Sequence, residues 1–198
     1  MASSGSSTLL SIDLDALLRR VKPEKRKGQL RPRPEADLVP AALVSGARRL
    51  PLVPDTTVYI HNAAGTLPAE VETLLDGALQ WHCSVCLGEL TTGIANYSPA
   101  APGWWGMKDV YAEVFHAIPD SRVLTPDDDA WLSAGLISST LARTQGLQRH
   151  QRKELLNDAL IYLTAGKAGL PVLTANRDEF DLVQQIAGTG LFIHYAPV

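Results

Sequence analysis

Short apolar segments alternate with helix-like segments through most of this 198-residue chain, and this alternation limits the possible folds more than any other feature. Segments with the composition of strands cover residues 57–61, 81–84, 121–124, 171–174 and 191–195. Helices are predicted over residues 68–78, 85–92, 108–117, 126–143, 151–168 and 179–187. Strands that alternate with helices are typical of a parallel sheet covered on both faces. The sequence therefore predicts an α/β protein with a three-layer α/β/α architecture and a central parallel sheet.

Charge divides the chain into two unequal parts. Residues 1–50 contain 10 Lys or Arg against 5 Asp or Glu, whereas residues 51–198 contain 8 against 16. We therefore expect a basic, partly helical N-terminal extension over residues 1–50 and a compact acidic domain over residues 51–198. Within the extension we expect disorder over residues 1–8, a short amphipathic helix over 9–21, a proline-containing linker over 22–34, and a second short helix over 36–47.

Composition excludes several classes of protein. No run of about 18 apolar residues is present, so a membrane-spanning helix is not expected. The N-terminus lacks the basic and then apolar order of a secretory signal. The only two cysteines, Cys83 and Cys86, are too few for a disulfide scaffold. We expect a cytoplasmic protein in which these cysteines belong to the core, since no second Cys/His pair completes a zinc site.

Four segments place carboxylates at the edges of apolar stretches, where side chains from different elements can share a cleft. They begin at Asp55, Glu89, Asn157 (followed by Asp158) and Thr174 (followed by Asp178 and Glu179). Carboxylates that share a cleft repel one another unless a positive group neutralises them, and a hard divalent cation with oxygen ligands does this. The pattern predicts metal-assisted cleavage of a phosphodiester, in which the cation activates and orients a water.

The same four segments resemble, in order, the motifs of PIN-domain ribonucleases, most closely the VapC-type toxins of toxin–antitoxin pairs. The matching segments are Asp55-Thr-Thr-Val-Tyr-Ile60, Ser84-Val-Cys-Leu-Gly-Glu89-Leu-Thr-Thr-Gly93, Asn157-Asp158-Ala-Leu-Ile161 and Thr174-Ala-Asn-Arg-Asp-Glu-Phe180. The resemblance covers residues 51–198. It implies a metal-dependent endoribonuclease that uses Mg²⁺ or Mn²⁺, cleaves RNA, binds a cognate antitoxin protein and forms a homodimer.

The resemblance also assigns roles to individual residues. It implies that Asp55, Glu89 and Asp158 hold the metal. The implied catalytic set is Asp55, Glu89, Asp158 and Glu179, and the implied supporting set is Thr56, Thr174, Asn176 and Asp178. Thr57 stands where the family usually has asparagine, which could weaken a hydrogen bond to Asp55. The fourth site residue stays open among Asn176, Asp178 and Glu179, with Glu179 matching best.

Other interpretations remain open. A PIN-like protein without catalysis could serve as an RNA- or protein-binding module, and the departures at Thr57 and Asn176 motivate this alternative. Any single acid could be a solvated helix end, and Asp127-Asp128-Asp129 is expected to cap a helix. The basic segment from Arg19 to Arg33 could be a flexible linker, an RNA-binding arm or a docking segment. Arg31 or Arg33 could also reach the acids from within the chain.

Overall fold

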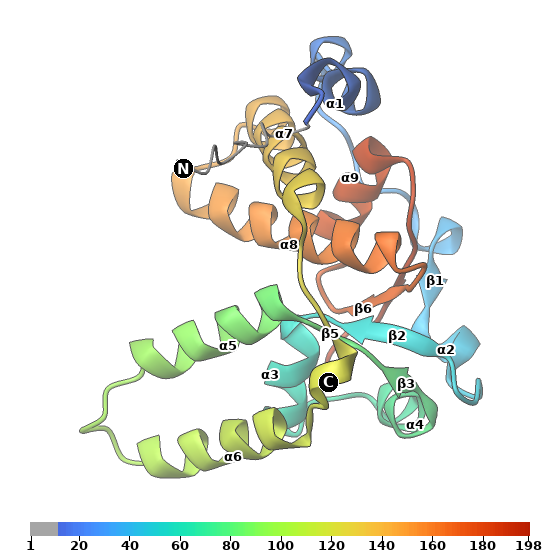
Figure 1. Ribbon diagram of the computed structural model, residues 1–198. Coiled ribbons are helices and arrows are strands. Elements are labelled where there is room, and N and C mark those ends of the chain that lie inside the picture. The colour runs from blue at the N-terminus through green and yellow to red at the C-terminus, as the bar shows by residue number, and fades with distance from the viewer. Residues whose placement is uncertain (1–11) are drawn as a thin grey trace, which may run out of the picture.

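The computed structural model describes residues 12–198, apart from the side chain of Arg149 (Figure 1). The disorder expected for residues 1–8 and the first residues of the helix expected over 9–21 lie outside this range. Among the residues described, no helix is long and apolar enough to cross a membrane.

A parallel five-stranded sheet forms the centre of the molecule, with the strand order β1-β7-β6-β2-β3. Its strands are β1 (Val39–Pro40), β2 (Pro51–Pro54), β3 (Leu79–Gln80), β6 (Val172–Thr174) and β7 (Phe192–His194). A separate parallel pair consists of β4 (His82–Cys83) and β5 (Val123–Leu124). The α-helices are α1 (Leu14–Val21), α2 (Ala41–Val44), α3 (Thr56–Ala64), α4 (Ala69–Gly77), α5 (Ser84–Asn96), α6 (Trp104–Ala117), α7 (Asp128–Gln145), α8 (Arg149–Lys167) and α9 (Arg177–Ala187). Three short 3-10 helices cover Pro23–Lys25, Glu35–Asp37 and Asp120–Arg122.

Both faces of the sheet are buried under helices. Val53, Val172 and Phe192 belong to one core cluster, which includes residues of α7, α8 and α9. Side chains alternate along a strand, so the neighbours of these three residues face the opposite side of the sheet. Leu52, Leu173 and Ile193 accordingly belong to a second cluster with residues of α2, α3 and α4. The predicted three-layer α/β/α architecture is confirmed.

The strand predicted over residues 57–61 is wrong, because these residues lie in helix α3 and the strand comes before them as β2. The Asp55 carboxylate caps this helix by accepting hydrogen bonds from the backbone N–H groups of Thr57 and Val58. Such a cap starts a helix even in a sequence of β-branched residues. The prolines at both ends of β2 do not prevent pairing, since the N–H groups of Val53 and Asp55 donate to the neighbouring segment 171–173.

Most of the other predicted elements are confirmed, with ends shifted by a few residues. The helix expected over residues 36–47 is wrong: this segment forms a 3-10 turn, strand β1 and the four-residue helix α2. Pro40 cannot donate a backbone hydrogen bond within a helix, and β1 instead pairs with the edge of β7. Cys83 and Cys86 are free, fully buried core residues, as predicted.

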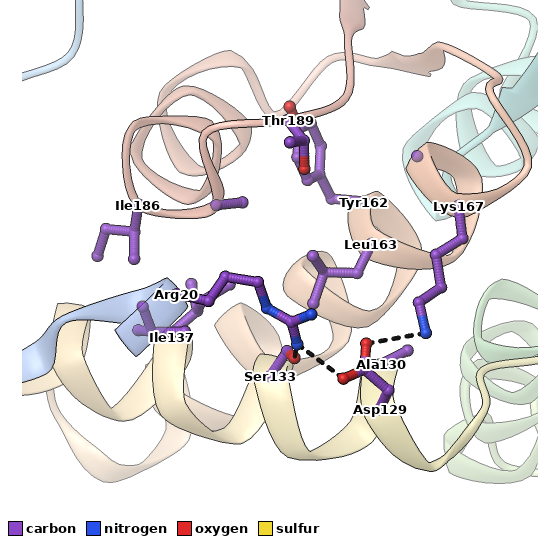
Figure 2. Close-up of a pocket in the computed structure, with 13 residues that line it drawn as sticks. Arg20, Asp129, Ala130, Ser133, Ile137, Tyr162, Leu163, Lys167, Ile186 and Thr189 are labelled. Atoms are coloured by element: carbon purple, nitrogen blue, oxygen red, sulfur yellow. Dashed lines mark hydrogen bonds and ion pairs between the residues drawn. The ribbon is translucent and has the colours of Figure 1, made fainter. Parts of the chain in front are cut away.

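The described part of the N-terminal extension packs closely on the body. Leu17 and Val21 of α1 are buried, and α1 contacts α7 and α9. Figure 2 shows Arg20 of α1 beside Ser133 and Asp129 of α7, with an Arg20–Asp129 distance of 2.8 Å. Lys167 of α8 joins the same carboxylate at 2.9 Å. The expected caps by the acidic run are confirmed at Asp127, which accepts from the N–H of Ala130. The boundary at residue 50 thus separates two parts of the sequence that differ in charge, although these two parts pack against each other.

Candidate active site

Asp55 lies at the carboxyl end of β2, where α/β sheets usually bind ligands, and is only 2% exposed. Its Oδ1 accepts hydrogen bonds from the Thr57 N–H at 2.8 Å and the Thr57 hydroxyl at 2.5 Å. Its Oδ2 accepts from the Thr174 hydroxyl at 2.5 Å. Burial raises the pKa of Asp55 to about 6, although these hydrogen bonds act in the opposite direction. The carboxylate is therefore held in a fixed orientation at a high electrostatic cost.

Thr57 joins the first and fourth segments. Besides donating to Asp55, its hydroxyl accepts a hydrogen bond from the N–H of Ala175 at 3.0 Å. The Thr174 hydroxyl likewise donates to Asp55 and accepts a hydrogen bond from the N–H of Asn176 at 2.8 Å. Thr57 therefore makes a direct hydrogen bond to Asp55 in this structure, at the position where a departure from the PIN-domain motif was expected to weaken such a bond.

Glu89 comes to the site from α5. Its carboxylate accepts hydrogen bonds from the Thr56 hydroxyl and from the Asn157 side-chain amide, the latter at 2.8 Å. These two donors belong to α3 and α8, so Glu89 connects three helices. Thr56 was expected to support the site, and it contacts Glu89 rather than Asp55.

Asp158 lies on α8 among the other acids. Burial raises its pKa well above the ordinary value, and the neighbouring charges of Asp55, Glu89 and Glu179 raise it further. Its Oδ2 accepts a hydrogen bond from the side-chain amide of Asn176 at 3.0 Å. Hydrogen bonds join the four segments, which are far apart in sequence, in one region: Thr174 donates to Asp55, Thr56 and Asn157 donate to Glu89, and Asn176 donates to Asp158.

The three candidates of the fourth segment point in different directions. Asn176 bonds to Asp158, and Glu179 lines a cavity of about 200 Å³ together with Asp158, Asn176 and Glu154. Burial raises the pKa of Glu179, with a further contribution from Asp178 and Glu154. Asp178 instead pairs with Arg177 at 2.8 Å and is half exposed. Asn176 and Glu179 are the members of this segment that lie beside Asp158.

The acids of the site are of the type that binds a divalent cation, but they are not gathered into a coordination shell. Among the described residues, no Lys, Arg or His forms an ion pair with Asp55, Glu89 or Asp158. A divalent cation with oxygen ligands would relieve their mutual repulsion. However, no group of three acidic, His or Cys side chains in residues 12–198 is gathered tightly enough to hold a metal ion. Glu89 and Asp158 are turned toward amide donors, so coordination requires rotation of these side chains.

Sequence reasoning named Asn157 only as the start of the third segment, without a role, and it missed Glu154. Asn157 directly precedes Asp158 and donates to Glu89. Glu154 lies one helical turn before Asp158 and adds to the raised pKa of both Asp158 and Glu179. The helical spacing i, i+4 was the signal that could have identified Glu154.

Two solved structures have a similar fold. FitAcB from Neisseria gonorrhoeae superposes with a TM-score of 0.51 and 18% identity, covering 73% of this chain and 96% of that one. VapBC2 from Rickettsia felis, bound to a DNA fragment from its promoter, gives a TM-score of 0.50 and 15% identity, with 73% and 98% coverage. The fold is PIN-like. No protein-family model matches the sequence, and no curated protein matches it either.

Proposed function

We propose that this protein is a metal-dependent endoribonuclease with a PIN-like fold and acts as the toxin of a toxin–antitoxin pair. The observation that carries the proposal is the convergence of Asp55, Glu89 and Asp158 at the carboxyl ends of β2 and β6, without a paired cation among the described residues. The PIN-like fold shared with FitAcB and VapBC2 supports the assignment to this class.

Each residue of the proposed site has its own role. Asp55, Glu89 and Asp158 would hold Mg²⁺ or Mn²⁺, and Thr57 and Thr174 fix the orientation of Asp55. A bound divalent cation would supply an activated water and neutralise charge that develops on the phosphate. Glu179, whose pKa is raised by burial, lines the same cavity as Asp158 and is the candidate group for proton transfer in this site. Asn176 keeps Asp158 oriented.

Replacing Asp158 by Asn tests this proposal, because the change keeps the shape of the side chain and removes its charge. We expect cleavage of an RNA substrate in Mn²⁺ to fall at least about 100-fold, as for loss of a principal metal ligand. Asp128→Asn, in the helix-capping acidic run, is the matched control and should leave the rate unchanged. Calorimetric titration with Mn²⁺ should show weaker binding in Asp158→Asn. Equal cleavage by Asp158→Asn and the parent protein would refute the mechanism.

One observation favours a second candidate, a PIN-like binding module without catalysis. The site acids are engaged with Thr56, Asn157 and Asn176, and no three of them are gathered for a metal ion in the described residues. This candidate predicts no saturable Mn²⁺ binding in the calorimeter. Binding that is stoichiometric and lost in Asp55→Asn would decide against it.

The partners and the location follow from the same proposal. A toxin of this class would bind a cognate antitoxin protein, act on RNA in the cytoplasm and form a homodimer. Sedimentation of the purified protein tests the dimer. A small neighbouring reading frame whose product co-purifies with this chain and suppresses its nuclease activity would identify the antitoxin.

A further inference from the structure

A second pocket adjoins the acid site at the carboxyl ends of β6 and β7. It has a volume of about 370 Å³, and its lining includes Asn176, Arg177, Glu179, Glu35 and His194. His194 and Thr174 are direct partners in the β6–β7 ladder, and Thr174 is the residue whose hydroxyl binds Asp55. Adjacent strands lie about 4.8 Å apart, so the floor of this pocket is one strand away from the Asp55 site.

His194 is a buried donor or acceptor without a partner. It is 4% exposed, and its Nε2 makes no hydrogen bond to any described residue. A buried polar atom left in this state carries a substantial desolvation cost. Burial also lowers the pKa of His194, so the ring is neutral near pH 7 and one of its nitrogens can donate a hydrogen bond. His194 lines the pocket, so a ligand that displaced the atoms covering Nε2 would give it a partner.

The N-terminus of α9 opens onto the same pocket. The first N–H groups of a helix have no intrahelical acceptors and carry partial positive charge. Asn176, the N-cap residue, does not satisfy them, since its side chain binds Asp158 instead. Arg177, the first residue of this 11-residue helix, adds a full positive charge. Buried His194, the helix end and Arg177 together favour an anionic group.

An anionic group already lies there. Glu35, from the 3-10 turn before β1, places its carboxylate 3.6 Å from Arg177, and this side chain is 67% exposed. An ion pair at this distance and exposure is weak and easily exchanged. Asp178 also binds Arg177, but Arg177 has five N–H donors and can serve a further acceptor. The Glu35 carboxylate thus occupies the position that a substrate anion would take.

We propose that this pocket is a phosphate subsite, in which Arg177, the N-terminus of α9 and His194 bind the phosphate of a nucleotide next to the one that is cleaved. The proposal rests on the proposed ribonuclease function for the identity of the ligand. Glu35 acts as an internal competitor that the phosphate displaces. Because Asp178 and Glu179 lie at the same helix end, the subsite positions the strand and contributes only modestly to its affinity.

The experiment compares RNA binding without cleavage. A fluorescent single-stranded RNA is titrated with the full-length protein in EDTA, and anisotropy gives the dissociation constant. We expect Arg177→Ala to weaken binding about tenfold, the loss of one charge-assisted contact, and Glu35→Gln to tighten it severalfold. Arg48→Ala is the matched control: it removes the same charge from an exposed residue that precedes the amino end of β2, whereas the pocket lies at the carboxyl ends of the strands. It should have little effect.

A second measurement follows His194 directly. Titration with inorganic phosphate should shift the His194 ring signals in NMR spectra of the parent protein and leave them unchanged in Arg177→Ala. Equal weakening of RNA binding by Arg177→Ala and Arg48→Ala, or unchanged binding by Glu35→Gln, would overturn the subsite. The EDTA measurement separates the two proposals. If the variants behave as expected but Mn²⁺ gives no cleavage, the subsite stands and the nuclease mechanism fails.

Discussion

At the scale of single residues, the acid site combines buried charge with fixed hydrogen-bond donors. Asp55 is held by Thr57 and Thr174 on both oxygens, yet burial raises its pKa. The hydrogen-bond donors fix the orientation of the Asp55 carboxylate, and burial destabilises its charged form. Such an arrangement stores electrostatic energy that a bound cation would release. The stability of the metal-free protein should therefore depend on the protonation of Asp55.

The first prediction concerns this pH dependence. The pKa of Asp55 is about 6 in the folded protein against 3.8 as its ordinary value, so between these values the folded state binds a proton that the unfolded state has lost. The contribution of Asp55 to stability is fully present below pH 3.8 and is lost as the pH rises through 6. The difference is about 3 kcal/mol. Urea unfolding in EDTA at pH 4.5 and pH 7 should show about 2 kcal/mol of this difference, because part of it is already lost at pH 4.5.

Asp55→Asn is the comparison for this measurement, since Asn remains a good helix N-cap and has no titrating group. The difference in unfolding free energy between the variant and the parent should increase in favour of the variant from pH 4.5 to pH 7. A constant difference over this range would contradict the raised pKa. Titrating groups distant from Asp55 affect both proteins alike and cancel in the comparison.

At the scale of elements, the segment before β1 is bound to α9 by an ion pair between buried Asp181 and Arg33, whose side chain is 37% exposed. The Arg33 Nε donates to Asp181 at 2.6 Å, and the Arg33 backbone N–H donates to the other carboxylate oxygen at 2.7 Å. Asp181 is fully buried, and Gln185 donates to it as well at 2.8 Å. Arg33 therefore fixes the basic segment to the body and, contrary to the possibility raised by the sequence, pairs with Asp181 rather than with the site acids.

The second prediction is that Arg33→Ala destabilises the protein by about 3 kcal/mol, because it leaves the buried Asp181 carboxylate without its cation. Urea unfolding provides the measurement. Arg19→Ala is the control, since the Arg19–Asp13 pair is exposed and 3.5 Å long, and should change little. The double variant Arg33→Leu, Asp181→Leu should recover most of the loss. If Arg33→Ala and Arg19→Ala have the same effect, the ion pair does not anchor the segment.

At the scale of the whole molecule, the N-terminal region completes the sheet and covers helices. Strand β1 adds an edge to β7, α1 packs on α7 and α9, and α2 packs on α4 (Figure 1). By contrast, the α5–α6 hairpin projects from the body, and none of the residues of α6 is buried. The described part of the basic N-terminal extension is therefore packed against the body.

The third prediction tests this packing. Removal of residues 1–50 should lower the unfolding free energy by at least about 3 kcal/mol, because it exposes the surfaces that Leu17 and Val21 cover and removes β1. The midpoint of urea unfolding gives the comparison. Leu43→Ala in the full chain is the control, since Leu43 is 76% exposed. A truncated chain as stable as the parent would show that residues 51–198 are an independent domain.

The layered α/β architecture and the acids that could form a site were predictable from local residue order. The periodicity of the long helices and the alternation of element types depend on local residue order, so they could be predicted. The strand expected at residues 57–61 could not be corrected from composition, because β-branched residues suit both a buried strand and a capped helix. Only the tertiary position of Asp55 at the end of β2 decided between them.

Which polar groups form hydrogen bonds and ion pairs with one another depends on the packed fold. The fourth segment offered Asn176, Asp178 and Glu179, with Glu179 as the best match. Packing of α9 on α8 brought Asn176 and Glu179 to Asp158, while Asp178 paired with Arg177. Arg33 met Asp181 across 148 residues of sequence, and the Nε2 atom of His194, in the same pocket lining as Arg177, has no hydrogen-bond partner among residues 12–198. Hydrogen bonds and ion pairs act over a few ångströms between groups that are distant in sequence, so their pairing is fixed by the packed fold rather than by local residue order.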